Sequence, residues 1–184
     1  MAHSFVKNLL TGICAFLSAC TNLPEIKTVD NVDLNRFMGD WYVVACIPTF
    51  IEKDIYNAVE SYKLNSDGTI KTHFTFRKGG FDGEKKEYEP KGYVIPKTGN
   101  ALWGMQFIWP IKAEYRIVYL DEGYQLTIIA RNARDYVWLM SRKPDISDKQ
   151  YQTYVNKIKD MGYDIDKLVK IPQHWDKQAE NEVE

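Results

Sequence analysis

Residues 114–142 read EYRIVYLDEGYQLTIIARNARDYVWLMSR, and this stretch decides the fold. Its apolar and aromatic residues fall into three runs, at 114–120, 124–130 and 136–142. Runs of this length and composition, bounded by turn residues, are typical of β-strands. Asp121-Glu122-Gly123 separates the first two runs, and Asp and Gly tolerate the backbone angles of a tight hairpin turn. The stretch therefore predicts three consecutive antiparallel strands.

Five more runs of the same kind lie upstream, at 41–47, 57–64, 69–77, 88–95 and 101–108. The connections between them are short and rich in Asn, Asp, Gly and Pro, so consecutive strands should pair antiparallel. Eight strands in such a meander expose two edges unless the sheet closes on itself. The sequence therefore predicts an all-β fold, an eight-stranded up-and-down antiparallel β-barrel. The interior of such a barrel is just wide enough for one small ligand.

The residues after the last run follow a different period. Ser147 and Gln150 are spaced as in a capping box, in which each side chain bonds the backbone N–H of the other residue. Apolar residues then recur at helical spacing, at Tyr151, Tyr154, Val155, Ile158 and Met161. Gly162 ends the pattern. We expect one C-terminal α-helix whose apolar stripe packs on the outside of the barrel.

The composition argues against several classes of protein. The chain has 184 residues with 24 basic and 25 acidic side chains, so it lacks the excess positive charge that a nucleic-acid partner would require. Three scattered histidines argue against a histidine-rich metal site, and three cysteines argue against a disulfide framework. The sequence contains no Gly-rich phosphate loop and no Ser/His/Asp or Cys/His arrangement. We therefore expect no cofactor, no metal and no enzymatic activity.

The N-terminus has the features of a secretory signal. Residues 1–7 carry a lysine, and residues 9–19 are nearly all apolar or small, a run too short to span a membrane. Leu17-Ser18-Ala19-Cys20 resembles the lipobox of bacterial lipoproteins, in which the cysteine thiol receives diacylglycerol. We therefore expect a signal peptide at 1–19 and lipidation of Cys20. An ordinary signal peptide that is cleaved elsewhere is the alternative.

The likeness to lipoproteins also bears on location and on domain boundaries. Thr21 stands where retention in the inner membrane usually requires Asp, which favours a lipid-anchored protein of the bacterial outer membrane. Residues 20–33 have no periodicity and predict a tether from the lipid to the domain. The barrel and helix then occupy 34–175, and 176–184 form a polar tail.

Alternation along the strands separates an inward face from an outward one. The faces that would converge inside a closed barrel are mostly aromatic or contain Met. They predict a ligand-binding lumen lined by Ala58, Glu60, Tyr62, Thr72, Phe74, Trp103, Met105, Phe107, Tyr115, Ile117, Tyr136, Trp138 and Met140. Ile70 and Tyr119 lie on the same faces as these residues. A solid core would need the same residues, so the sequence leaves a cavity and a filled barrel both open. Glu60 faces either a wet lumen or, if the register slips locally, the solvent.

Three segments together resemble a known family. Gly39-Asp40-Trp41-Tyr42 opens the first strand, and Arg134-Asp135-Tyr136-Val137-Trp138-Leu139-Met140-Ser141-Arg142 contains the last. With the helix and Met161-Gly162-Tyr163-Asp164-Ile165-Asp166-Lys167-Leu168, they resemble the lipocalins, above all the bacterial outer-membrane lipoproteins akin to apolipoprotein D. The resemblance covers about residues 30–173. It implies a hydrophobic ligand, such as a fatty acid or a (lyso)phospholipid, in the barrel.

Three of these motif residues have structural roles that follow from their chemistry. Gly39 lacks a Cβ and permits a tight turn beneath the barrel, and Trp41 is large enough to plug the closed end. Arg142 can lie across the indole of Trp41 and donate to carbonyls of the entry turn. Strict alternation places Cys46 on the opposite face from Trp41, outside the barrel.

The loop after the first strand carries Pro48, Phe50 and Ile51, which suggests a lid or a membrane-facing lip at the open end. The leading hypothesis is an outer-membrane lipoprotein that binds or transports a hydrophobic ligand. The alternatives are a structural or partner-binding envelope lipoprotein with a filled barrel, or a lipocalin-type enzyme. A monomer and a homodimer are both compatible with the sequence.

Overall fold

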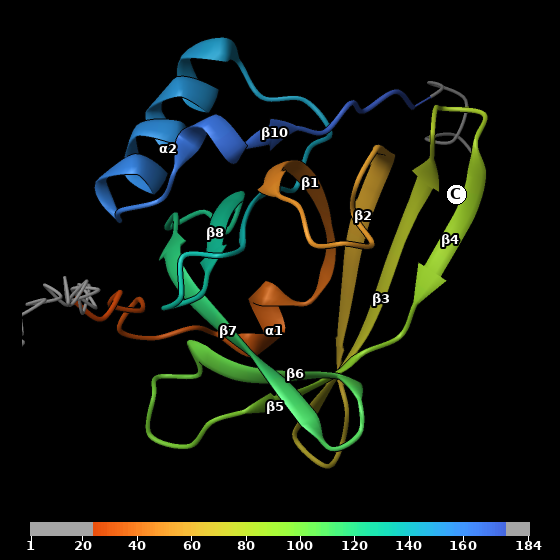
Figure 1. The fold of residues 1–184 in the computed structure, drawn as a ribbon. Coiled ribbons are helices and arrows are strands. Elements are labelled where there is room, and N and C mark those ends of the chain that lie inside the picture. The colour runs from red at the N-terminus through yellow and green to blue at the C-terminus, as the bar shows by residue number, and fades with distance from the viewer. Residues whose placement is uncertain (1–23, 176–184) are drawn as a thin grey trace, which may run out of the picture.

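The computed structural model describes residues 24–175, which form a β-barrel with one long helix beside it (Figure 1). The strands are β1 (Gly39–Ile47), β2 (Ile55–Leu64), β3 (Thr69–Lys78), β4 (Glu84–Tyr88), β5 (Lys91–Val94), β6 (Leu102–Ile108), β7 (Ile111–Leu120), β8 (Leu126–Ala130), β9 (Val137–Ser141) and β10 (Val169–Lys170). The helices are α1 (Leu34–Phe37), α2 (Asp148–Asp160) and one 3-10 turn (Ile165–Lys167). Within 24–175, no helix is both long and apolar enough to cross a membrane.

The sheet closes because β1 pairs with β2 along one edge and with β9 along the other. Every neighbouring pair around the barrel is antiparallel, and β4 and β5 together form the fourth strand of the meander. The predicted eight-stranded up-and-down barrel is therefore confirmed. The short β10 adds to β1 outside the closed circuit.

The fourth strand is interrupted at residues 89–90, where Pro90 has no N–H to donate. β4 pairs only with β3, whereas β5 pairs with both β3 and β6. The pairing of β5 with β6 ends at Gln106, and Figure 1 shows β4 standing apart from β6 beyond that point. The wall of the barrel is therefore incomplete between β4 and β6, on the half that is farther from α1.

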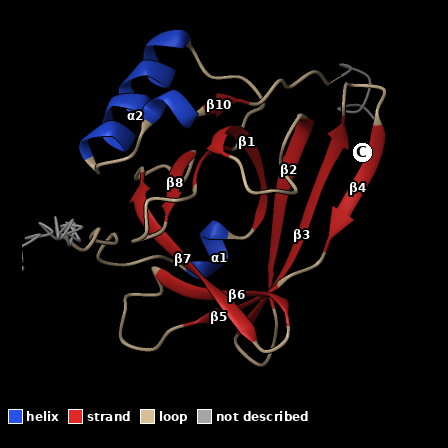
Figure 2. Ribbon diagram, viewed as in Figure 1, coloured by secondary structure: helices blue, strands red, loops and turns tan. Residues whose placement is uncertain are grey.

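Two apolar cores lie on the two sides of the sheet. One fills part of the barrel and includes Phe37 of α1 and Trp41 of β1. The other lies between the sheet and α2, which covers the outside of the barrel (Figure 2), and it includes Tyr154 and Ile158 of the helix. The capping box of Ser147 is present, with its hydroxyl accepting from the backbone N–H of Gln150. The predicted external helix is thus confirmed.

A bulge in β1 corrects the expected position of Cys46. The pairing of β1 with β9 shifts register between Val43 and Ala45, so the alternation changes phase there. Val43 and Cys46 consequently belong to the core inside the barrel, whereas Val44 and Ala45 face α2. The expectation that Cys46 lies outside is wrong, because it assumed an unbroken period of two residues.

A second bulge, in β7, has the same effect on Tyr119. The pairing of β7 with β8 shifts register between Ile117 and Tyr119. Ile117 lies inside the barrel, but the ring of Tyr119 packs against Tyr154 of α2 with centroids 5.2 Å apart. Tyr119 was expected to share the inward face of Ile117, and the structure places it outside.

The described part of the expected tether, residues 24–33, runs along the barrel wall. Ile26 and Val32 are buried, one in each apolar core. Backbone N–H groups of Val29 and Val32 donate to the carbonyls of Ile117 and Gly99, at 2.9 and 2.8 Å. This segment is therefore part of the folded domain from Pro24 onward.

Candidate functional site

The closed end of the barrel is sealed by aromatic side chains. Trp41 is fully buried, and its indole N–H donates to the carbonyl of Phe37 at 2.8 Å. The ring of Phe37 lies 5.0 Å from that of Trp41 and 5.4 Å from that of Trp103. The short helix α1, which the sequence analysis did not predict, supplies Phe37. These rings form the floor of the barrel.

Arg142 covers the outer face of this floor, as predicted. Its guanidinium carbon lies 3.8 Å from the centroid of the Trp41 ring. Its two terminal nitrogens donate to the carbonyls of Arg36, Phe37, Met38 and Asp40, at 2.7–3.0 Å. Gly39 has φ +91°, and a Cβ there would lie 3.4 Å from the guanidinium, so the turn requires glycine.

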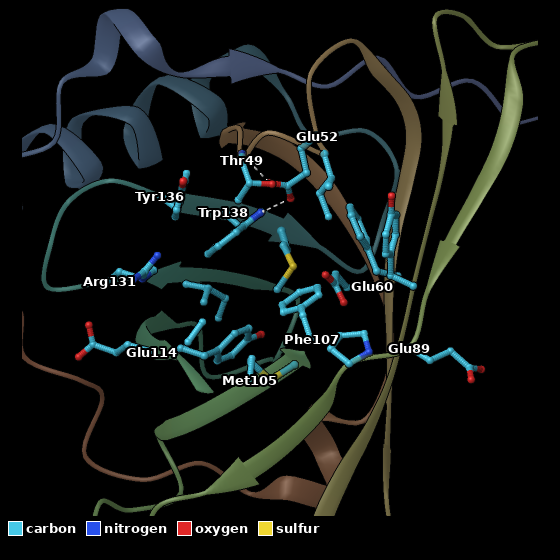
Figure 3. Close-up of a pocket in the computed structure, with 18 of the residues that line it drawn as sticks. Thr49, Glu52, Glu60, Glu89, Met105, Phe107, Glu114, Arg131, Tyr136 and Trp138 are labelled. Carbon is cyan, nitrogen blue, oxygen red and sulfur yellow. Dashed lines mark hydrogen bonds between the residues drawn. The ribbon is translucent and has the colours of Figure 1, made fainter. Parts of the chain in front are cut away.

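Above the floor lies a cavity of about 520 Å³ (Figure 3). Apolar and aromatic side chains make up most of its wall. Its lining residues are Thr49, Phe50, Ile51, Glu52, Glu60, Tyr62, Phe74, Tyr88, Glu89, Pro90, Met105, Phe107, Ile108, Ala113, Glu114, Tyr115, Ile129, Arg131, Tyr136, Trp138 and Met140. The β1–β2, β6–β7 and β8–β9 loops surround its mouth, at the end of the barrel opposite Trp41.

Most of the residues predicted for the lumen line this cavity. They are Glu60, Tyr62, Phe74, Met105, Phe107, Tyr115, Tyr136, Trp138 and Met140. The other four are Ala58, Thr72, Trp103 and Ile117, which are buried inside the barrel but do not line the cavity. Trp103 stacks on Tyr115 at 5.0 Å and belongs to the floor. The barrel is therefore filled near its closed end and hollow near its mouth, which resolves the choice between core and cavity.

Some lining residues could not be found by alternation. Ile129 faces the cavity from β8, but the strand Leu126–Ala130 carries apolar residues on both faces, so its pattern does not show which face points inward. Pro90 and Tyr88 line the cavity because the fourth strand breaks beside them. Glu52 and Arg131 reach it from loops, where no period exists.

Glu60 is the acidic group deepest in the cavity, and Figure 3 shows its carboxyl pointing inward. Its Oε2 is fully buried and has no hydrogen-bond partner among the described residues. Burial, together with the charge of Glu52, raises the pKa of Glu60 well above its ordinary value. The raised pKa favours the protonated form of Glu60, whose O–H can donate to an oxygen atom of a ligand. Of the two orientations that the sequence left open for Glu60, the structure shows the one towards the lumen and not the one towards solvent.

Three further polar groups in the cavity wall are paired with protein atoms. The hydroxyls of Tyr62 and Tyr115 lie 2.8 Å apart. The carboxylate of Glu52 accepts from the indole N–H of Trp138 at 2.6 Å and from the backbone N–H of Thr49 at 2.8 Å. Glu52 thereby holds both the Trp138 ring and the β1–β2 loop in position. Glu60 keeps an unpaired buried oxygen, and the hydroxyl of Thr49 is the other such oxygen among the described residues that line the cavity.

The thiol of Cys46 lies inside the barrel wall but does not line the cavity. Burial, and secondarily the charge of Glu52, raise the pKa of Cys46 far above its ordinary value. The sulfur is therefore present as the thiol, which is a weak nucleophile. Among residues 24–175, no three His, Cys, Asp or Glu side chains converge to hold a metal ion.

Comparison with known proteins identifies the class that this barrel and cavity define. The family model described as a lipocalin-like domain matches residues 32–173. Temperature-induced lipocalin-1 of Arabidopsis thaliana is 32% identical over 162 residues, covering 83% of this chain and 86% of the plant protein. Outer membrane lipoprotein Blc of Vibrio cholerae is 27% identical over 161 residues, covering 85% of this chain and 92% of that protein.

Among solved structures, insecticyanin from the tobacco hornworm Manduca sexta has a TM-score of 0.64 at 17% identity, covering 85% of this chain and 87% of its own. The chain belongs to the lipocalin family, and its relatives include Blc lipoproteins and apolipoprotein D. The resemblance stated from the sequence is confirmed over nearly the range that it covered.

Proposed function

We propose that this protein is a lipoprotein of the bacterial outer membrane that binds a fatty acid or a lysophospholipid in its barrel. The observation that carries the proposal is the cavity of about 520 Å³, which is apolar, open at one end and sealed at the other by Trp41. This volume lies within the range of small-molecule sites in proteins. A barrel with a purely structural role would gain stability from filling this space.

The distribution of polar groups supports an amphiphile with one acyl chain. The chain would lie against Met105, Met140 and Trp138, where each buried methylene contributes ~0.8 kcal/mol. The O–H of Glu60 would donate to an oxygen of the ligand, which supplies the partner that Oε2 lacks in the protein. A pure hydrocarbon would leave this oxygen unpaired.

The anchoring part of the proposal rests on the lipobox-like sequence that ends at Cys20, which lies outside the described residues. The relative from Vibrio cholerae is named an outer membrane lipoprotein and matches over 92% of its length, which supports the same location here. Lipid storage, transport or maintenance of the envelope would be the corresponding role.

We propose a binding protein rather than an enzyme. No Ser, Cys or His is among the residues that line the cavity in the described part of the chain. Burial keeps the Cys46 thiol protonated and away from the cavity, so it is poorly suited to nucleophilic attack on a bound ligand.

Mass spectrometry of an organic extract tests the proposal. Protein purified without detergent should release a single-chain fatty acid or lysophospholipid in near-stoichiometric amount. The variant Met105→Trp, which fills the cavity, should release much less from the same membranes. If the parent protein and Met105→Trp release equally small amounts of lipid, the result would favour the alternative of a barrel with a purely structural role.

A further inference from the structure

An apolar rim surrounds the mouth of the cavity, and we define it as Phe50, Ile108, Trp109 and Ile111. Their exposed fractions are 83%, 72%, 82% and 69%. The other large apolar side chains exposed in residues 24–175 reach at most 51%, at Phe107, which is next to the rim. A concentration of exposed apolar side chains at one end of a soluble domain indicates an interaction surface.

The rim is continuous with the cavity. Phe50 and Ile108 belong to both, since they line the cavity and are also exposed. The rim comes from the β1–β2 loop, the β6–β7 turn and the two strand ends beside that turn. The incomplete wall between β4 and β6 adds Glu89 and Pro90 to the same opening. Any ligand that enters or leaves the cavity at this end passes the apolar rim.

The N-terminal segment, residues 24–33, extends from the closed end of the barrel to the open end that carries the rim. Near the closed end, the backbone N–H of Asp33 donates to the hydroxyl of Tyr124 at 2.9 Å. Further from α1 the segment, red and orange in Figure 1, passes β7, where the Val29 N–H donates to the carbonyl of Ile117. At its far end, Ile26 donates to the side chain of Asn132 at 2.9 Å.

The loop that receives this far end belongs to the mouth. Asn132 lies in the β8–β9 loop, whose residues Arg131 and Tyr136 line the cavity. Arg134 of that loop donates to the carbonyl of Pro24 at 2.5 Å, and Arg116 donates to the carbonyl of Ile26 at 2.9 Å. The described residues therefore begin at the open end of the barrel, and the chain then passes to the closed end before it enters β1.

Chain length then constrains where a lipid on Cys20 can be. Only four peptide links separate Cys20 from Pro24, and an extended chain of that length spans at most ~14 Å. If Cys20 carries diacylglycerol, as the proposed function states, the membrane surface is within this distance of Pro24, which is bonded to the β8–β9 loop at the open end. Because the anchor holds a membrane close to this end of the barrel, we take a lipid surface, and not a second copy of the chain, as the partner that covers the rim.

We propose that the apolar rim inserts into the boundary between lipid headgroups and acyl chains, so that the cavity opens directly onto the membrane. Trp109 suits that position because an indole combines a large apolar surface with one N–H donor. Phe50, Ile108 and Ile111 add apolar area that is otherwise in contact with water. A lipid would then pass between membrane and barrel without crossing water.

Vesicle sedimentation tests this docking without the anchor. The probe is the chain 20–184 carrying Cys20→Ser, which contains every described strand and helix, mixed with vesicles of phosphatidylethanolamine and phosphatidylglycerol. Trp109→Ser/Ile111→Ser should weaken partitioning at least about tenfold, since two large apolar side chains are lost from the contact. Ile95→Ser/Trp175→Ser removes the same side-chain types from sites outside the rim and should leave partitioning unchanged.

Ligand binding in solution separates this inference from the proposed function. Trp109 and Ile111 do not line the cavity, so their double variant should bind a monomeric fatty acid as the parent does. Met105→Trp should lose the fatty acid and still sediment with vesicles. The inference is overturned if the parent does not sediment, or if the rim variant and the Ile95/Trp175 control sediment equally. A rim-dependent dimer that ignores vesicles would also overturn it and would assign the rim to a second copy.

Discussion

The guanidinium of Arg142 lies on the indole of Trp41, with its Cζ 3.8 Å from the ring centroid, at the seam where the barrel closes. Trp41 belongs to β1, and Arg142 directly follows β9, the strand that pairs with β1 to complete the sheet. Arg142 also donates to carbonyls of the turn that leads from α1 into β1. One side chain thus joins the first and last strands of the barrel to its floor.

Arg142→Ala should lower the free energy of unfolding by about 1–3 kcal/mol, because the stacking contact is lost and several carbonyls lose their donor. Chemical denaturation followed by far-UV circular dichroism measures the change. Arg142→Lys should recover only part of the loss, since an ammonium cannot reach the same set of carbonyls. Arg77→Ala, at an exposed arginine of β3, serves as the control, and an equal effect of the two alanine variants would contradict the prediction.

Glu60 should make the unfolding free energy depend on pH. Its pKa in the folded protein is raised, so the folded state holds a proton that the unfolded chain releases. The contribution of Glu60 to the unfolding free energy is therefore fully present below its ordinary pKa near 4.5. This contribution is lost as pH rises from 4.5 towards the pKa of Glu60 in the folded protein.

Glu60→Gln removes this titration. As pH rises from 4.5 towards the folded pKa of Glu60, the unfolding free energy of the variant minus that of the parent should therefore increase by up to ~1.4 kcal/mol per pH unit. Urea denaturation of both proteins between pH 4 and pH 8 provides the comparison. Other groups near Glu60, namely Glu52, Tyr62 and Tyr115, are present in both proteins and cancel in the difference. A difference that stays constant over this pH range would show that Glu60 is ionised in the folded state.

Long-chain fatty acids should quench tryptophan fluorescence, because Trp138 lines the cavity. The affinity should rise with chain length by about fourfold per methylene, which corresponds to ~0.8 kcal/mol. Met105→Trp should weaken binding by filling the cavity, whereas Gln106→Trp places the same ring on the outer face of β6 and should not. Affinity independent of chain length, in both the parent and Met105→Trp, would contradict the cavity assignment.

Cys20→Ala should abolish lipid attachment. The parent should incorporate labelled palmitate in bacterial cells and fractionate with the outer membrane, and the variant should do neither. Cys46→Ala is the matched control, since this cysteine is buried in the barrel wall and should leave both properties unchanged. Labelling that persists in Cys20→Ala would place the modification elsewhere.

The strands, their order and the external helix could be predicted from sequence because each depends on local patterns. Runs such as 114–120 and 124–130 and their turn residues specify a meander, and Ser147 with Gln150 marks the start of α2. Nine of the residues that line the cavity followed from the same alternation, Met105 and Trp138 among them. Helix α1 could not be predicted in this way, because four residues do not show a period.

The sequence by itself determined that this chain is an up-and-down barrel with an aromatic interior, since strand pairing and apolar burial follow from short-range chemistry. Only the tertiary structure decided that the interior is filled at Trp103 and hollow at Met105, because that depends on how rings from several strands pack together. The side on which Cys46 lies was decided in the same way, by a bulge that arises from the pairing of β1 with β9. The approach of Pro24 to the open end likewise depends on contacts with a loop more than a hundred residues away, which no local pattern encodes.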